Sequence, residues 1–372
     1  MAPGKDDRLS SDREAEKAAF LSQNGLADAT RERLAGDAST RLYERLHRPS
    51  GASLIFMDQP PKAETQPCPP HASPDERRAL GYNAIARLAA GRIEAFVAVA
   101  GYLKGLGFST PEIIAADAAT GLAVLEDLGD DVFARLLEAG GDETALYDGA
   151  IDCLVRLHAE TPPDRLVADG AEWPLLTFDD LALQVYGEEL FLEWWPKYVG
   201  QPPISPAAAA EWDALWAPVR ARGVAGADVF CHRDYHAENL IWLPRRQGAA
   251  RVGMLDFQDA VRAHPAWDMS MLLHDARREV SPEREAAALA RYLAARPNLD
   301  AKAFIADFHA LGALNCTRIL FIFARQVIGF ERPRYAAFMP RMWRYLDRCL
   351  ATPELAGLKT WFAKNVSREV VA

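Results

Sequence analysis

The stretch that most constrains this chain runs over residues 229–240 and reads V-F-C-H-R-D-Y-H-A-E-N-L. Its first three residues are apolar, as in a buried strand, and they pass directly into His232, Arg233 and Asp234. Asn239 follows after four intervening residues, and a second apolar run begins immediately behind it. We therefore expect one carboxylate and one amide to be presented together on a short polar loop between two buried segments.

The spacing H-R-D-x-x-x-x-N is typical of the catalytic loop of protein-kinase-like phosphotransferases. A phosphoryl acceptor needs a carboxylate that orients its hydroxyl group and takes its proton, and Asp234 is the candidate for this base. The Mg²⁺ ion that accompanies the nucleotide needs an oxygen ligand on the same loop. Asn239 is the candidate for that ligand.

A second candidate metal ligand follows at a suitable distance. Residues 252–255 read as a short apolar strand that ends in Asp256, and kinases of this type place their main Mg²⁺ ligand at such a position. The plainer alternative is that Asp234 and Asp256 cap loops or pair with buried cations. Three residues recur by chance, but the loop, its apolar flanks and the later aspartate together favour the kinase interpretation.

The composition disfavours several classes of protein. The chain has 372 residues, 50% hydrophobic and 25% charged, which is enough for two domains or one two-lobed unit. The net charge of -10 disfavours nucleic acid as a partner, because the chain would repel the phosphate backbone. Five scattered cysteines, no apolar run of about 18 residues and no apolar leader predict a cytoplasmic protein with no membrane partner.

The N-terminal third, residues 1–126, reads as a small strand-rich lobe. A helix is expected over residues 12–23 and strands over residues 41–46 and 52–57. The turn before the first of these strands would lie over the nucleotide phosphates, which its backbone N–H groups and a hydroxyl group can contact. The candidate cofactor-binding residues of this turn are Gly36, Asp37, Ala38 and Ser39.

The strand over residues 52–57 departs from the protein-kinase pattern, because it lacks the lysine that contacts the α- and β-phosphates. Two explanations stay open. A basic residue such as Arg41 or Arg45 reaches the phosphates, or the loop backbone and the metal suffice. The proline-rich segment that follows, residues 59–74, is expected to be a mobile surface loop.

A strand pair over residues 112–116 and 122–125 leads into the candidate hinge between two lobes. The hinge consists of Glu126, Asp127 and Leu128, and its backbone N–H and C=O groups would bind the edge of the adenine ring. The tetrapeptide E-D-L-G is weak by itself. Its place between a strand-rich part and a helix-rich part of the chain supports the assignment.

The rest of the chain, residues 127–372, is predicted to be a larger helical lobe. Residues 178–195 are rich in aromatic and acidic side chains, and form either a helix packed on this lobe or a lid that offers aromatic faces to a sugar. The helix over residues 301–327 carries Arg318 and Arg325 in an apolar pattern, so each needs a carboxylate partner from the protein or a substrate. Further helices are expected over residues 75–90, 93–106 and 144–159, and the C-terminal third, residues 282–366, is expected to be nearly all helical.

Three residues around the catalytic loop are candidate substrate contacts, namely His236, Asp259 and Arg277. Asp259 either touches the substrate or caps a turn. Arg277 and its neighbour Arg278 suit an anionic substrate, but at the end of a helix they also complement the helix dipole. Asp268 is expected to cap and tie down the catalytic loop.

Almost the whole chain resembles the aminoglycoside-phosphotransferase branch of the kinase-like superfamily. The resemblance rests on L-A-G-D-A-S-T-R-L-Y, M-D-Q-P-P, L-E-D-L-G-D, H-R-D-Y-H-A-E-N-L-I-W, L-D-F-Q-D-A and H-D-A-R-R-E-V. It implies an α+β, bilobal protein-kinase-like fold, with a small β-rich N-lobe and a large helical C-lobe. Within this branch the chain is similar to the bacterial kinases that phosphorylate the anomeric hydroxyl of N-acetylmuramate and N-acetylglucosamine in peptidoglycan recycling.

The resemblance implies a role for each candidate. Asp234 would be the base, Asn239 and Asp256 would hold Mg²⁺, and residues 126–128 would take the adenine of ATP. The expected partners are ATP and an N-acetylated amino sugar, and we expect a monomer. The easily ionised anomeric hydroxyl would leave most of the catalysis to positioning and charge neutralisation.

Two other functions are considered. The first is a kinase of another small hydroxylated substrate, such as an aminoglycoside, an amino alcohol or another sugar amine. The second is a nucleotide-binding or scaffold protein without catalysis. Cationic substrates favour a pocket rich in carboxylates, whereas the lactyl carboxylate of muramate favours an arginine. We therefore predict that Arg277, Arg278 or Arg318 lies near the substrate site.

Overall fold

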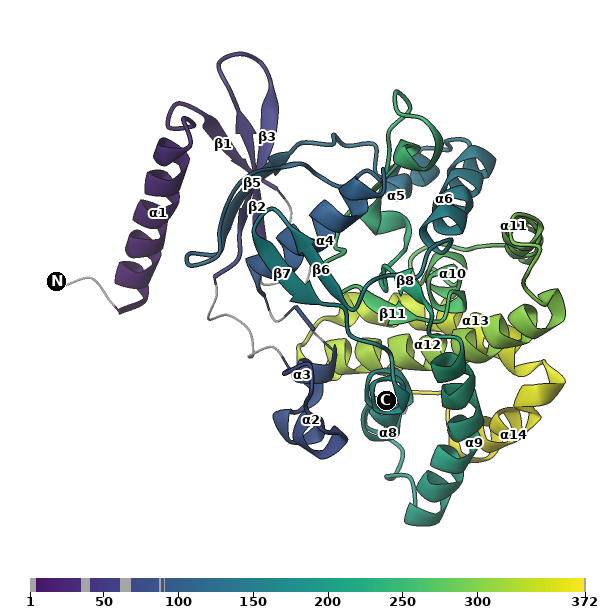
Figure 1. The fold of residues 1–372 in the computed structure, drawn as a ribbon. Coiled ribbons are helices and arrows are strands. Elements are labelled where there is room, and N and C mark those ends of the chain that lie inside the picture. The colour runs from purple at the N-terminus through teal and green to yellow at the C-terminus, as the bar shows by residue number, and fades with distance from the viewer. Residues whose placement is uncertain (1–4, 35–40, 61–67, 87, 90, 371–372) are drawn as a thin grey trace.

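Five antiparallel strands form a sheet in the N-terminal part of the chain. The computed structural model describes residues 5–34, 41–60, 68–86, 88–89 and 91–370, and the sheet has the order β1-β2-β3-β5-β4 (Figure 1). These strands agree with those expected from the sequence, and β1 adds one at the edge. The strands are β1 (Thr30–Arg33), β2 (Leu42–His47), β3 (Ser53–Asp58), β4 (Ile113–Asp117) and β5 (Leu122–Glu126).

The two faces of this sheet pack against different parts of the protein. On one face Leu46 and Phe56 form a small cluster with Phe20 of helix α1 (Lys5–Gln23), which covers the sheet (Figure 1). Met57, the next residue along β3, belongs instead to the large core of the helical body. Because successive side chains of a strand point to opposite faces, the sheet connects both cores.

The structure differs from the single helix expected over residues 75–90. Two short helices replace it, α2 (Pro74–Leu80) and α3 (Tyr82–Ala86). Gly81 between them has a φ of 85° and a ψ of 175°, a non-helical backbone conformation that interrupts the helix and that glycine adopts without strain. The next helix, α4 (Ile93–Gly105), agrees with the expectation.

The proline-rich segment agrees with its prediction only in part. Residues 61–67 lie outside the described residues. Residues 59–60 and 68–73 form no helix or strand, as expected. However, Gln59 and Cys68 are buried and not on the surface, so the described ends of this segment pack against the protein.

The C-terminal part of the chain is mostly helical, as predicted. The helix α4 precedes the expected lobe boundary, yet it shares one core with the helices that follow. The division into residues 1–126 and 127–372 stays a prediction. The helices are α5 (Phe133–Glu138), α6 (Glu143–Leu157), α7 (Asp180–Ala182), α8 (Phe191–Val199), α9 (Pro206–Ala225), α10 (Ala266–Leu273), α11 (Pro282–Ala294), α12 (Ala301–Gly329), α13 (Met339–Leu350) and α14 (Ala356–Asn365).

Helix α12 runs through the middle of the helical body, with α13 beside it (Figure 1). By length and composition this helix could cross a membrane, but 72% of its most apolar window is buried inside the protein. Its apolar character is therefore explained by packing, because a helix surrounded by other helices is hydrophobic on most sides.

Residues 178–195 do not form one helix. Helix α7 continues into a π-helix over residues 183–189, and α8 begins only at Phe191. Gly187 explains part of this geometry, because a Cβ atom there would lie 2.5 Å from the Leu314 side chain of α12. The side chain of the neighbouring Tyr186 lines the cleft described below.

Three short antiparallel pairs complete the structure. One of them, β8 with β11, and another, β9 with β10, carry the polar loops of the central motif. The strand expected over residues 229–231 is thus confirmed. The pairs are β6 (Arg165–Ala168) with β7 (Ala171–Pro174), β8 (Val229–Cys231) with β11 (Val261–Ala263), and β9 (Leu240–Trp242) with β10 (Val252–Met254).

Candidate active site

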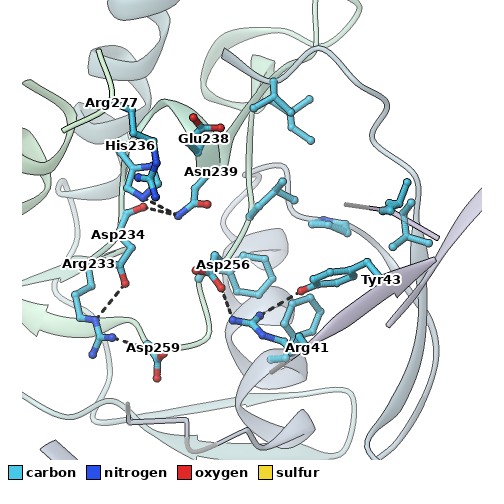
Figure 2. Close-up of a pocket in the computed structure, with 18 of the residues that line it drawn as sticks. Arg41, Tyr43, Arg233, Asp234, His236, Glu238, Asn239, Asp256, Asp259 and Arg277 are labelled. Carbon is cyan, nitrogen blue, oxygen red and sulfur yellow. Dashed lines mark hydrogen bonds and ion pairs between the residues drawn. The ribbon is translucent and has the colours of Figure 1, made fainter. Parts of the chain in front are cut away.

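A cleft of about 1070 Å³ lies between the sheet and the helical body. Its lining begins at the candidate hinge, passes the polar loops that follow β8 and β10, and ends at the C-terminal half of α12. Asp234, Asn239 and Asp256, which the sequence places on two separate loops, meet in this one cleft (Figure 2).

The backbone holds the two loops against each other. The Nε2 atom of His232 lies 2.9 Å from the Leu255 carbonyl oxygen, to which it donates, and the Leu255 N–H donates to the Asn239 carbonyl at 2.9 Å. Asp234 follows β8, Asn239 precedes β9 and Asp256 follows β10. These bonds therefore set the relative position of all three polar side chains, whatever occupies the cleft.

Asp268 ties down the start of the catalytic loop, as the sequence predicts. Its carboxylate is fully buried and accepts hydrogen bonds from the backbone N–H groups of His232, at 2.7 Å, and Arg233, at 2.8 Å. Arg233 has a φ of 79°, which is uncommon for a residue with a side chain. Its carbonyl oxygen also accepts the Trp267 indole N–H at 3.0 Å. An uncommon backbone conformation that several hydrogen bonds hold in place is typical of functional loops.

Two guanidinium groups flank the candidate base. One Asp234 carboxylate oxygen lies 3.5 Å from Nε of Arg233, and the other lies 3.8 Å from Nη2 of Arg318. The backbone carbonyl of Asp234 accepts a hydrogen bond from the Asn239 amide nitrogen at 2.9 Å. The amide oxygen of Asn239 is thereby turned away from Asp234, as Figure 2 shows.

Asp256 is paired with Arg41, a residue of the N-terminal part of the chain. A nitrogen of the Arg41 guanidinium donates to the Asp256 carboxylate, and another donates to Gln258 at 2.8 Å. Desolvation in the cleft by itself would raise the pKa of Asp256, but the charge of Arg41 and the Gln258 amide outweigh it and hold that pKa well below its usual range. Asp256 is therefore ionised throughout the neutral range.

The donor set suits a divalent cation. Mg²⁺ is bound in proteins by carboxylate and amide oxygens, usually with only one or two carboxylates plus nucleotide phosphates. The ionised Asp256 carboxylate and the exposed side of the Asn239 amide are such oxygens. The guanidinium of Arg41 already places a positive charge at this carboxylate, which is the electrostatic role that a metal ion would share.

The structure places the two arginines that were considered as substitutes for the missing strand lysine in different parts of the cleft. Arg41 is buried and points into the cleft at Asp256, next to Tyr43 (Figure 2). Arg45 instead pairs with Asp127, at 2.7 Å, and with Asp130, at 2.9 Å, at the hinge. Of the two candidates only Arg41 therefore lies at the metal side of the cleft. The candidate phosphate loop, Gly36 to Ser39, falls outside the described residues.

Apolar side chains line the cleft around the backbone of the candidate hinge. The side chains of Glu126 and Asp127 are already engaged, Glu126 by Arg246 at 2.7 Å and Asp127 by the Gly129 N–H at 2.9 Å. Leu128 lines the cleft. A flat aromatic ring would thus meet apolar side chains and backbone groups here. The apolar lining includes Leu34, Ile55, Leu125, Val132, Ile241 and Leu255.

The three candidate substrate contacts all line the cleft, in different settings. His236 lies near Asn239, and burial lowers its pKa, so its imidazole is neutral at pH 7. Asp259 accepts the Ala89 backbone N–H at 2.7 Å and lies 3.5 Å from Arg233, so its carboxylate already has structural partners. Arg277 sits beside His236 (Figure 2).

The far end of the cleft contains residues that sequence reasoning assigned only in part. Arg318 lines the cleft as predicted, and the carboxylate partner it was expected to need is Asp234. Arg318 also donates a hydrogen bond to the Tyr186 hydroxyl at 2.6 Å. Tyr82 and Arg325 were not predicted as site residues. The spacing of Arg318 and Arg325, seven residues apart on one helix, is the signal that identifies this face.

The fold and the cleft together define a bilobal, protein-kinase-like phosphotransferase. Comparison with known proteins agrees with this class. Residues 30–305 match the model of the phosphotransferase enzyme family. The chain belongs to this family.

Similar proteins of known name support the same assignment. The chain is 66% identical to an N-acetylmuramate/N-acetylglucosamine kinase of Caulobacter vibrioides, over 97% of this chain and 99% of the relative. It is 29% identical to the N-acetylmuramate/N-acetylglucosamine kinase of Pseudomonas aeruginosa, over 87% of this chain and 84% of that protein.

Solved structures share the fold at low sequence identity. A choline/ethanolamine kinase family protein from Mesorhizobium loti superimposes with a TM-score of 0.53 and 17% identity, over 95% of this chain and 98% of the other. An aminoglycoside 2′-phosphotransferase in complex with GDP gives a TM-score of 0.52 and 12% identity, over 93% and 99%. The α+β bilobal fold expected from the sequence is confirmed.

Proposed function

We propose that this chain is a cytoplasmic, monomeric kinase that transfers the γ-phosphoryl group of ATP to the anomeric hydroxyl of N-acetylmuramate and N-acetylglucosamine, in peptidoglycan recycling. One observation carries the proposal, namely the 66% identity to a kinase named for these two sugars over nearly the full length of both chains. The cleft supports it, because its far end presents the cations Arg318 and Arg325 rather than a cluster of carboxylates.

In this proposal Asp234 is the base. Its carboxylate accepts the proton of the anomeric hydroxyl while that oxygen forms a bond to the γ-phosphorus of ATP. The bond between the γ-phosphorus and the bridging oxygen breaks at the same time, and ADP leaves with the electron pair. Arg233 and Arg318 flank Asp234 and fix the position of its carboxylate in the cleft.

The nucleotide is assigned to the hinge side. The backbone of residues 126–128 takes the adenine edge, and the turn of residues 36–39 takes the phosphates. Mg²⁺, held by Asn239 and Asp256, supplies charge neutralisation of the phosphates when bound. Arg41, which directly precedes β2, complements this charge in the place of the lysine that the strand over residues 53–58 lacks. His236, Asp259 and Arg277 are proposed to border the sugar and the transferred phosphate.

The test is a screen of ATP consumption over N-acetylated sugars, aminoglycosides and amino alcohols, with the phosphorylated position located by phosphorus NMR. The proposal requires turnover of N-acetylmuramate or N-acetylglucosamine with an anomeric phosphate as product. Turnover of an aminoglycoside or amino alcohol alone would replace it with the alternative small-molecule kinase. Removal of Mg²⁺ with a chelator should abolish turnover, and readdition should restore it.

A further inference from the structure

Arg325, near the C-terminal end of α12, is held between aromatic rings at the far end of the cleft. Its guanidinium carbon lies over the rings of Tyr82, at 5.6 Å, Trp194, at 5.7 Å, and Phe330, at 5.2 Å from each centroid. We propose that Arg325 is the carboxylate-binding residue of the substrate site, so that it recognises the acidic ether arm of N-acetylmuramate and has no such partner on N-acetylglucosamine. This inference rests on the proposed function.

The rings orient Arg325 without neutralising it. They come from three separate segments, α3, α8 and the residues after α12, so the tertiary structure builds this surround. Aromatic faces attract a guanidinium group, and they leave its N–H edge available to a planar anion. Gly329 adds to the packing, because a Cβ atom there would lie 3.2 Å from the Trp194 ring.

The positive charge of Arg325 has no carboxylate partner from the described part of the protein, which favours an anionic ligand. Among the residues that the structure describes, no carboxylate lies within ion-pair distance of Arg325, although its side chain is partly buried in the cleft. Arg41 and Arg318 differ from it, since Arg41 pairs with Asp256 and Arg318 lies 3.8 Å from Asp234. A partly buried cation without a counterion is costly, and an anionic substrate removes that cost.

The distance from the base suits a sugar. Arg318 lies at Asp234, and Arg325 follows it by seven residues, which is about two turns or roughly 10 Å further along the same face of the helix. Ile322 lines the cleft between them and offers an apolar surface to a sugar ring. A pyranose with its anomeric hydroxyl at Asp234 can therefore direct an acidic arm toward Arg325.

A second cation reinforces the positive end of the cleft. Glu331 has a φ of 55°, and this left-handed turn brings the chain back so that Arg332 also lines the cleft. The Arg332 side chain donates to Gln326 at 3.1 Å, and its backbone N–H donates to the Gln326 carbonyl at 3.0 Å. Arg332 therefore adds positive charge near Arg325, while its own position is set by the helix.

The arginines that the sequence favoured are less suited to this task. Arg318 donates through Nε to Asn315, at 3.0 Å, and through Nη1 to Tyr186, so its donors are engaged. Arg278 pairs with Glu138, at 2.8 Å, and with Glu238, at 3.0 Å. Arg277 lies on the His236 side of the catalytic loop (Figure 2).

The experiment compares kcat/KM for both sugars in the full-length enzyme and its variants. Arg325→Gln should lower kcat/KM for N-acetylmuramate by roughly 10- to 100-fold, as expected for loss of one charged hydrogen-bonded pair, and change the value for N-acetylglucosamine by less than about twofold. Arg325→Lys should recover part of the loss. Turnover of N-acetylglucosamine verifies in each case that the variant is folded.

A second substrate tests whether the effect of Arg325 depends on the carboxylate of the sugar. The methyl ester of N-acetylmuramate lacks the carboxylate charge, so the wild-type enzyme should lose activity on it, while Arg325→Gln should treat ester and acid alike. Arg251→Gln is a matched control. It removes an exposed arginine outside the cleft lining, whose guanidinium lies 5.5 Å from the centre of the Trp242 ring, and it should leave kcat/KM unchanged for both sugars.

The outcomes separate the inference from the proposed function. If the wild-type enzyme phosphorylates neither sugar, the proposed function fails. The wild-type enzyme could phosphorylate both sugars while Arg325→Gln lowers kcat/KM for both equally, or for neither. In that case the assignment of Arg325 is wrong and the kinase assignment stands. A wild-type enzyme that accepts only N-acetylglucosamine would also overturn the assignment of Arg325.

Discussion

The two ends of the cleft are built in different ways. The catalytic end takes Asp234, Asn239 and Asp256 from one short part of the chain. Hydrogen bonds of the loop backbone, to one another and to the side chains of His232 and Asp268, set their positions. The α12 end is assembled from side chains of distant segments, which pack through ring contacts with Arg318 and Arg325.

This difference suits two separate tasks, phosphoryl transfer at the catalytic end and substrate recognition at the α12 end. Phosphoryl transfer needs the same base and metal ligands for every acceptor, and hydrogen bonds to the backbone hold the residues that we propose for these roles whatever the acceptor is. Recognition depends on which side chains face the cleft, and these can change without disturbing the loops. Substitutions at the catalytic end should therefore affect all acceptors equally, whereas those at the α12 end should distinguish between acceptors.

The largest effect is expected at the base. Asp234→Asn keeps the shape of the side chain but cannot accept the proton, so kcat should fall by about 10²- to 10⁴-fold for both sugars, with KM little changed. Steady-state kinetics measure this, and circular dichroism checks the fold. Turnover close to that of the wild type would remove Asp234 from the role of base.

A smaller loss is expected for Arg41→Met. If Arg41 replaces the strand lysine, kcat/KM for ATP should fall by roughly 10- to 100-fold. Arg45→Met should lower kcat/KM for ATP by no more than about fivefold, since Arg45 forms partly exposed ion pairs at the hinge. Arg31→Met, which removes an ion pair with Glu44 outside the cleft lining, is the control that should leave kinetics unchanged. A larger loss for Arg45→Met than for Arg41→Met would reverse the assignment.

At the α12 end, Arg318→Met should lower kcat/KM by about tenfold for both sugars alike, because Arg318 supports Asp234 and Tyr186 rather than an acidic arm. The ratio of the two kcat/KM values is the quantity to measure. A loss confined to N-acetylmuramate would show that Arg318, and not Arg325, contacts the carboxylate.

The smallest effect concerns pH. Arg41 holds the pKa of Asp256 below its usual range, against the desolvation that would raise it. Loss of Arg41 should therefore raise this pKa, and the fall of kcat/KM at acid pH should begin at a higher pH in Arg41→Met than in the wild type. Coinciding acid limbs in the two pH profiles would mean that Asp256 does not depend on Arg41.

Local patterns predicted the parts of the structure that depend on neighbouring residues. Alternation identified the strand β2, an apolar run identified β3, a turn between two short segments identified β4 and β5, and helical patterns identified α4, α6 and α12. The loop from Asp234 to Asn239 and the later Asp256 were recognisable because all three lie close together in the sequence. The break at Gly81 was missed, although glycine is the residue that tolerates its backbone conformation.

The sequence by itself determined the class of chemistry, because Asp234, Asn239 and Asp256 lie close together along the chain and form a recognisable motif. Tertiary structure decided which cations complete the site. Arg41 meets Asp256 across 215 residues, and Arg325 meets Tyr82 and Trp194 from three different helices. No periodicity records such contacts, because they depend on how the sheet and the helices pack and not on the order of the residues.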